Sequence, residues 1–162
     1  MSTLTIAEQV ENVLNGALSV RGDEAFNLGK AMLIGVKTEG DAVLDINAEL
    51  AGDADIYDLL TDPKNLRRAN PYDTIAILTT GWAAPIESSG GEMGMPSDHP
   101  LRRRVRLLMC ANLRGVASVL RFSDDQENTL IDEGEAVGPL AIAVQSFVID
   151  SQNNNKPWGE GV

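Results

Sequence analysis

The sequence lacks residues that several classes of protein depend on. Its single cysteine, Cys110, excludes an internal disulfide framework and a zinc site built from cysteines. No apolar run approaches the roughly 20 residues that span a bilayer. The opening segment MSTLTIAEQ has neither the basic nor the apolar region of a secretory signal. We therefore expect a cytoplasmic protein with no membrane segment.

Positive charge is also scarce, because 13 Lys and Arg stand against 24 Asp and Glu and give a formal net charge of −11. Nucleic-acid phosphates attract basic surfaces, so this balance argues against direct nucleic-acid binding and leaves a basic protein partner open. Aromatic residues are few, with three Phe, two Trp and two Tyr, and we expect a largely aliphatic core.

Catalytic and ligand-binding motifs are missing as well. The chain has no G-x-x-x-x-G-K-[ST] phosphate loop, no G-x-S-x-G nucleophile elbow and no EF-hand calcium pattern. His99 is the only histidine, and a lone histidine in a loop is more typical of a surface residue than of an acid–base catalyst. Cys110 lies late in an apolar run, where cysteine is usually small and buried. We predict no catalytic residue, cofactor or metal site, and we favour a protein that is not an enzyme.

The first part of the chain is predicted to be helical. The capping-box pattern TIAE starts a run of apolar residues at helical spacing, which predicts a helix over residues 5–19. A second helix is predicted over residues 23–40, with a buried strand at 31–36 as the competing interpretation. Asp and Gly punctuate residues 41–70, which indicates further short helices.

The character of the sequence changes after Pro71. Segments rich in β-branched residues predict strands, and a Gly/Ser/Met loop separates the first from the second. An acidic loop then leads to a helix that begins at a Gly-Pro pair. The predicted segments are strands within 72–86, 101–112 and 115–123, loops over 87–98 and 124–135, and a helix over 139–150.

Together these segments predict an α+β fold. A helical N-terminal half precedes a mainly antiparallel sheet of about three strands, with the C-terminal helix packed on one face. A chain of 162 residues fits a single domain, which we assign to residues 1–150. Residues 151–162 are predicted to form a flexible polar tail.

The segment LRRRVRLLMC concentrates arginine on a predicted strand. Because side chains alternate along a strand, Arg102, Arg104 and Arg106 are expected on one face. Arg103 is expected on the opposite face, towards the core. Two structural interpretations are that carboxylates of the 124–135 loop neutralise the arginines, or that the charges protect a sheet edge from aggregation. The functional interpretation is a site for an anion or an acidic partner.

Two further residues belong to this candidate site. His99 precedes the arginine strand, and Trp82 ends the strand before it, so both lie beside the 87–98 loop. Exposed tryptophans often anchor partner interfaces, and a role in capping the core is the alternative for Trp82. The candidate binding residues are Arg102, Arg104, Arg106, His99 and Trp82.

The motifs GWAAP, HPLRRRVRLL, GVASVLRFSDD and DEGEAVGPLAIA resemble those of a group of uncharacterised small acidic proteins from actinobacteria and their phages. The resemblance covers residues 72–145, and the arginine strand and GVASVLRF are its most specific parts. It implies that this region folds as one unit in an intracellular protein. The group has no assigned activity, so the resemblance implies no catalytic residue.

Three functions fit these observations. The one that we favour is a non-enzymatic cytosolic interaction or regulatory protein with a protein partner, because no catalytic constellation is present and the charges are segregated. The first alternative is a binding protein or enzyme for a small anion or nucleotide that uses the arginine face and His99. The second is an acidic decoy of nucleic acid that occupies a basic protein surface. Homo-oligomerisation stays open at this level.

Overall fold

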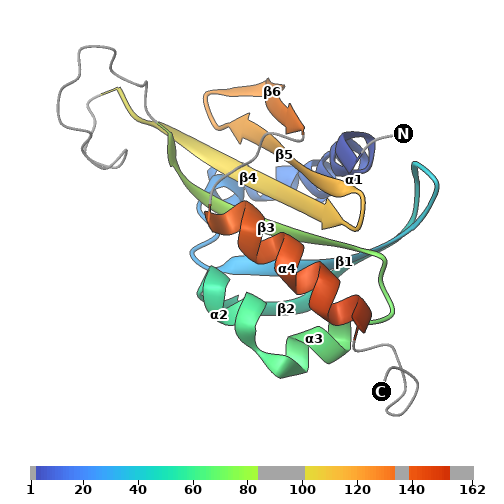
Figure 1. The fold of residues 1–162 in the computed structure, drawn as a ribbon. Helices are drawn as coiled ribbons and strands as arrows, with labels where there is room; N and C mark the ends of the chain where they lie inside the picture. Colours follow the sequence, from blue (N-terminus) through green and yellow to red (C-terminus); the bar gives the residue numbers. More distant parts are fainter. Residues whose placement is uncertain (1–2, 84–100, 134–138, 154–162) are drawn as a thin grey trace, which may run out of the picture.

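The computed structural model describes residues 3–83, 101–133 and 139–153 (Figure 1). Within these ranges the chain forms a six-stranded sheet with helices on both faces. None of the described helices is long and apolar enough to cross a membrane. In chain order the elements are α1 (Thr3–Leu18), the 3-10 helix η1 (Ser19–Phe26), β1 (Ala31–Glu39), β2 (Ala42–Ala54), α2 (Ile56–Thr61), α3 (Pro63–Ala69), β3 (Thr74–Ala83), β4 (Arg103–Asn112), β5 (Gly115–Phe122), β6 (Asp125–Glu133) and α4 (Pro139–Asn153).

The strands follow the order β2-β1-β3-β4-β5-β6, and every neighbouring pair is antiparallel. Strands β3 and β4 lie at the centre of the sheet. Their register places Trp82 opposite Arg104 and Thr80 opposite Arg106. On the other side of β4, Arg106 faces Arg121 of β5. The register therefore brings three arginine-bearing positions and Trp82 to one end of the sheet.

Two predictions about the sheet are wrong. Residues 31–54 form the β1–β2 hairpin rather than helices, and the expected acidic loop at 124–135 contains strand β6. The described part of the chain holds six strands instead of about three. The α+β class itself is confirmed, but the helical N-terminal half is interrupted by this hairpin.

The burial of β1 on both faces explains why the sequence pattern of residues 31–39 favours a helix. Leu33 and Ile34 are buried on opposite faces of the sheet, so β1 lacks the polar–apolar alternation of a half-exposed strand. A Cβ atom on Gly35 would lie 2.6 Å from Cδ2 of the Tyr72 ring, and glycine therefore lets this ring rest directly on the strand. The competing interpretation, a buried strand at 31–36, gives the correct element type.

The sheet separates two apolar cores. Helix α1 packs on one face, in a core that includes Val10 and Leu108. Helices α2, α3 and α4 pack on the other, in a core that includes Met109 and Phe147. Figure 1 shows α4 crossing the front of the sheet and α1 behind it. Helices therefore cover both faces of the sheet, and α1 covers the face that carries Arg106.

Candidate functional site

Trp82 and two arginines form an exposed cluster at the end of β3 and β4. The Trp82 side chain is 39% exposed. The guanidinium carbon of Arg102 lies 4.9 Å from the centroid of the Trp82 ring, and that of Arg104 lies 4.8 Å from it. Both distances are within the range of cation–π attraction. The cross-strand pairing of Trp82 with Arg104 sets this geometry.

Arg104 is held by neutral groups. Its Nε donates a hydrogen bond to the Phe26 carbonyl oxygen at 2.7 Å, and its Nη2 donates to Oδ1 of Asn27. No carboxylate among the described residues forms an ion pair with Arg104. The side chain is therefore positioned by η1 and the residue after it, while its positive charge is not neutralised there by an acid.

A surface hollow of about 500 Å³ opens beside this cluster. Its walls are formed by Phe26, Asn27, Trp82, Arg104 and Ser123. The Ser123 amide donates a hydrogen bond to the Arg104 carbonyl oxygen at 3.0 Å, which holds the start of the β5–β6 turn beside β4. The hollow thus presents the exposed Trp82 ring next to the guanidinium group of Arg104, with the buried Phe26 beneath. This combination can accept a side chain that is flat or apolar and carries, or lies beside, a negative charge.

Arg103 pairs with Asp124, the first carboxylate of the acidic segment, and the alternation of the strand places it on the face opposite Arg104. Its Nη2 lies 2.5 Å from Oδ1 of Asp124 and its Nε donates to Oδ2 at 2.9 Å. The guanidinium also stacks on Phe122, 3.9 Å from the ring centroid. The hydrogen bond from Arg103 lowers the pKa of the Asp124 carboxyl. One carboxylate of the acidic segment therefore pairs with the arginine strand, but not on the face that carries Arg104. The expectation that Arg103 lies towards the core is wrong, because its side chain is 41% exposed.

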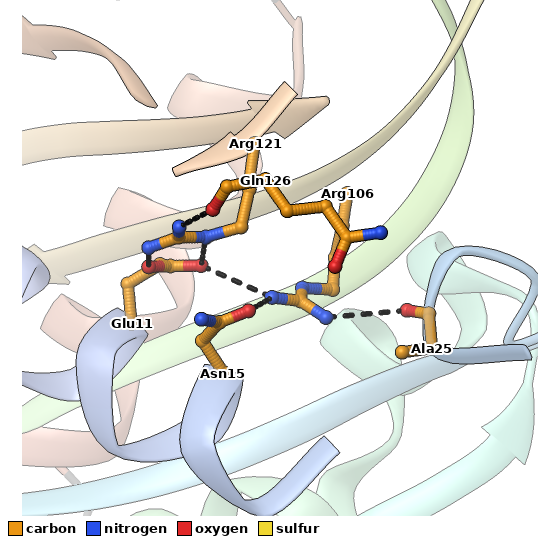
Figure 2. A network of polar contacts seen from close by, with 6 residues as sticks. All are labelled: Glu11, Asn15, Ala25, Arg106, Arg121 and Gln126. Carbon is orange, nitrogen blue, oxygen red and sulfur yellow. Dashed lines mark hydrogen bonds and ion pairs between the residues drawn. The ribbon is translucent and has the colours of Figure 1, made fainter. Parts of the chain in front are cut away.

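Arg106 lies beneath α1 and is 1% exposed, in contrast to the open arginine face that the sequence predicts (Figure 2). Its Nη2 contacts Oε2 of Glu11 at 3.3 Å and donates to Oδ1 of Asn15 at 2.5 Å. Its Nη1 donates to the Ala25 carbonyl oxygen at 3.3 Å. Burial lowers the pKa of Arg106, and its hydrogen bond to Glu11 opposes this effect. This arginine holds α1 and η1 on the sheet and is closed to solvent.

Arg121 completes the buried network. It binds Glu11 through two parallel hydrogen bonds, Nη2 to Oε1 at 2.5 Å and Nε to Oε2 at 3.0 Å, and its Nη1 donates to the Gln126 carbonyl oxygen. Two guanidinium groups therefore share one buried carboxylate (Figure 2). We name Glu11, Arg106 and Arg121 the buried triad.

The buried triad is not among the predictions made from the sequence. The position of Glu11 in α1 is the one feature of the sequence that indicates it. Glu11 follows Ala7 by four residues and precedes Leu14 by three, so it lies on the apolar stripe of α1. A carboxylate in such a stripe needs a buried cation as its partner. The sequence does not show which arginine that is, because the partners come from strands about 100 residues further along the chain.

Two other residues considered from the sequence are His99 and Cys110. His99 lies outside the described residues. Cys110 is fully buried, which raises the pKa of its thiol to about 12 and leaves it protonated at neutral pH. Among the described residues no group of three His, Cys, Asp or Glu side chains is arranged to hold a metal ion.

Comparisons with known proteins add nothing to this geometry. No protein-family model, no curated protein and no solved structure matches the chain. The functional argument therefore rests on the residues themselves.

Proposed function

We propose that the chain is a non-enzymatic interaction protein that binds an acidic protein partner through Trp82, Arg102 and Arg104. The observation that carries the proposal is the exposed Trp82 ring with two guanidinium groups against it, beside the hollow of about 500 Å³. Tryptophan and arginine are the residue types that most often dominate the binding energy of protein interfaces.

The charge of the cluster supports an acidic partner. Arg104 contacts neutral groups, and the molecule as a whole carries a formal charge of −11. A partner that is basic overall would be drawn to the rest of the surface, whereas an acidic segment gains most at Arg104. We place the protein in the cytoplasm, in keeping with its single cysteine. The resemblance to actinobacterial and phage proteins makes an actinobacterial lysate the proposed source of the partner.

The test compares capture by three immobilised proteins. These are the native chain, the double variant Trp82→Ala/Arg104→Glu, and the control Leu113→Ala/Arg67→Glu. The control removes an exposed apolar side chain, 68% accessible in Leu113, and reverses one exposed arginine outside the cluster. Proteins retained at one-to-one stoichiometry are identified, purified and titrated against each variant.

We expect one acidic protein to bind the native chain and the control, and to bind the double variant at least about 30-fold more weakly. Equal binding to all three chains contradicts the proposal. So does the capture of no protein. If inorganic phosphate or a nucleotide, and no protein, binds the native chain and not the double variant, the cluster is a small-anion site instead.

A further inference from the structure

A second hollow lies between the 3-10 helix η1 and the β1–β2 hairpin, and none of its lining residues belongs to the Trp82 cluster. Its volume is about 380 Å³. Apolar side chains of Leu28, Met32, Ala48 and Ala51 line it. Leu28, Met32 and Ala48 also pack against the core beneath α1, so the hollow is an open extension of that core.

The local sequence of β2 creates the space. Three small residues of β2 line the hollow, where larger side chains would fill it: Ala48, Ala51 and Gly52. The pairing of β1 with β2 also shifts register between Ala31 and Leu33 and again between Leu33 and Gly35. Such irregularities bend a strand and expose its neighbours. Methionine adds a flexible and polarisable wall that adapts to different apolar ligands.

Two cations complete the lining. Arg21 and Lys30 are exposed and line the same hollow. Neither side chain forms a hydrogen bond or ion pair with any described residue. In a chain with 24 acidic residues against 13 basic ones, these two cations give the hollow a local positive charge. Apolar walls together with positive charges complement a molecule that has an apolar body and an anionic end.

We propose that this hollow binds a single-chain amphiphile with an anionic head group, of the alkyl carboxylate class. The alkyl chain lies along Leu28, Met32 and Ala48, where it leaves water. The head group lies at Arg21 and Lys30, which supply charge-assisted hydrogen bonds. The ligand is a monomer in solution rather than a lipid of a bilayer, because a chain with a net charge of −11 is repelled by an anionic membrane surface.

The test titrates the isotope-labelled full chain with decanoate below its micelle concentration and follows the backbone amides by NMR. We expect saturable shifts confined to residues 28–32 and 48–52 and to the amide of Arg21. The double variant Arg21→Glu/Lys30→Glu should bind at least about tenfold more weakly. The matched control Lys64→Glu/Arg67→Glu reverses the same number of exposed charges on α3 and should bind as the native chain does.

Ala48→Trp fills the hollow and should abolish the shifts. If that variant does not fold, the two charge-reversal variants decide, since all four residues are exposed. Decyltrimethylammonium should produce no saturable shift at these residues, and vesicles of phosphatidylglycerol should not retain the protein. The proposal is overturned by equal binding of decanoate to the Arg21→Glu/Lys30→Glu variant, by shifts elsewhere, or by equal binding of the cationic amphiphile. Retention by the vesicles would assign the hollow to a membrane surface instead.

Discussion

Glu11 ties α1 to the sheet through buried ion pairs. Its side chain is 3% exposed and both of its oxygens contact guanidinium groups. Arg106 and Arg121 lie directly opposite each other on β4 and β5, where two like charges repel. The carboxylate from α1 removes most of this repulsion. Arg106 keeps one buried donor, Nε, without a partner among the described atoms, so the network is not fully satisfied.

We predict that Glu11→Ala lowers the free energy of unfolding by about 3–5 kcal/mol, because it leaves two buried guanidinium groups without their carboxylate. Urea unfolding followed by circular dichroism measures the change. Glu8→Ala, an exposed position on the same helix, should change it by less than about 0.5 kcal/mol.

If Glu11→Ala does not fold, the triple variant Glu11→Leu/Arg106→Met/Arg121→Met provides the readout. It should recover most of the native stability, because apolar replacement of a whole buried ion network is often neutral. Equal stability of Glu11→Ala and Glu8→Ala would show that the triad does not hold the helix.

Cys110 gives a prediction that depends on pH. Burial raises the pKa of its thiol to about 12, whereas the thiol of the unfolded chain ionises near its ordinary value, about 8.5. Between these values the folded state holds one more proton than the unfolded state. This contribution to stability is therefore intact below about pH 8.5 and is lost as the pH rises towards 12, at roughly 1.4 kcal/mol per pH unit.

The measurement is the free energy of unfolding between pH 8 and pH 10.5 for the native chain and for Cys110→Ala. The native chain should lose stability more steeply above pH 9, and the difference between the two slopes isolates the thiol from lysine and tyrosine. The native thiol should also resist a disulfide reagent at pH 8 until urea unfolds the chain. Parallel slopes, or rapid reaction of the folded protein, would show that the thiol is accessible.

At the scale of elements, the sequence is most informative where periodicity is clear. Helices α1 and α4 and the central strands β3, β4 and β5 lie where the apolar patterns predict them. Of the short helices predicted within residues 41–70, α2 and α3 form: Asp55 caps α2 by accepting a hydrogen bond from the Tyr57 amide, and Pro63 begins α3. Alternation along β4 correctly predicts that Arg106 and Leu108 share a face.

Strands β1 and β6 could not be predicted because neither shows strand alternation, whereas the segment LDINAEL in β2 does alternate apolar and polar residues and is a strand signal. Because β1 is buried on both faces, its sequence has few polar residues. Gly35 leaves room for the ring of Tyr72, a contact that the local sequence does not show. Strand β6 is rich in carboxylates and reads as a loop, although it is an edge strand, where charge is common. The buried triad depends on how α1 meets the sheet, a contact between segments about 100 residues apart.

Gly35→Ala tests the account of the β1–β2 hairpin. The added Cβ would lie 2.6 Å from the Tyr72 ring, so we expect a loss of about 1–3 kcal/mol in the free energy of unfolding. Gly16→Ala is the matched control, since Gly16 lies in α1 with nothing within 4 Å of its Cβ position. It should raise stability by about 0.5–1 kcal/mol. Thermal unfolding distinguishes the opposite signs, and a stabilising Gly35→Ala would contradict the packing described.

At the scale of the whole molecule, an acidic chain keeps part of its positive charge at one end of its sheet. Arg106 and Arg121 form buried ion pairs with Glu11. Arg103 is paired with Asp124. Arg102 and Arg104 lie against Trp82 at the surface. The arginines in and next to β4 therefore have different roles. One arginine holds a helix, one neutralises a turn, and the others form the proposed contact surface.

The charge on this surface predicts that binding of the acidic partner weakens with salt. Raising sodium chloride from 50 to 300 mM should lower the affinity through a faster dissociation rate, because counterions screen the contacts of Arg102 and Arg104 with the bound partner. The association rate should not fall, since the net charge of −11 does not attract an acidic partner at long range. Surface plasmon resonance at several salt concentrations measures both rates. A dissociation rate that does not change with salt would show that charge does not hold the complex together.

The most direct test of the proposed contact surface is an NMR map of the complex, recorded on the isotope-labelled Trp158→Phe variant with the captured partner. Trp82 then supplies the only indole N–H signal. The account predicts that this signal and the amides of residues 26–27 and 102–104 shift on binding, while those of residues 38–41 and 112–114, which lie at the opposite end of β4, do not. Shifts at the second set with an unchanged Trp82 signal would place the interface elsewhere and contradict the account.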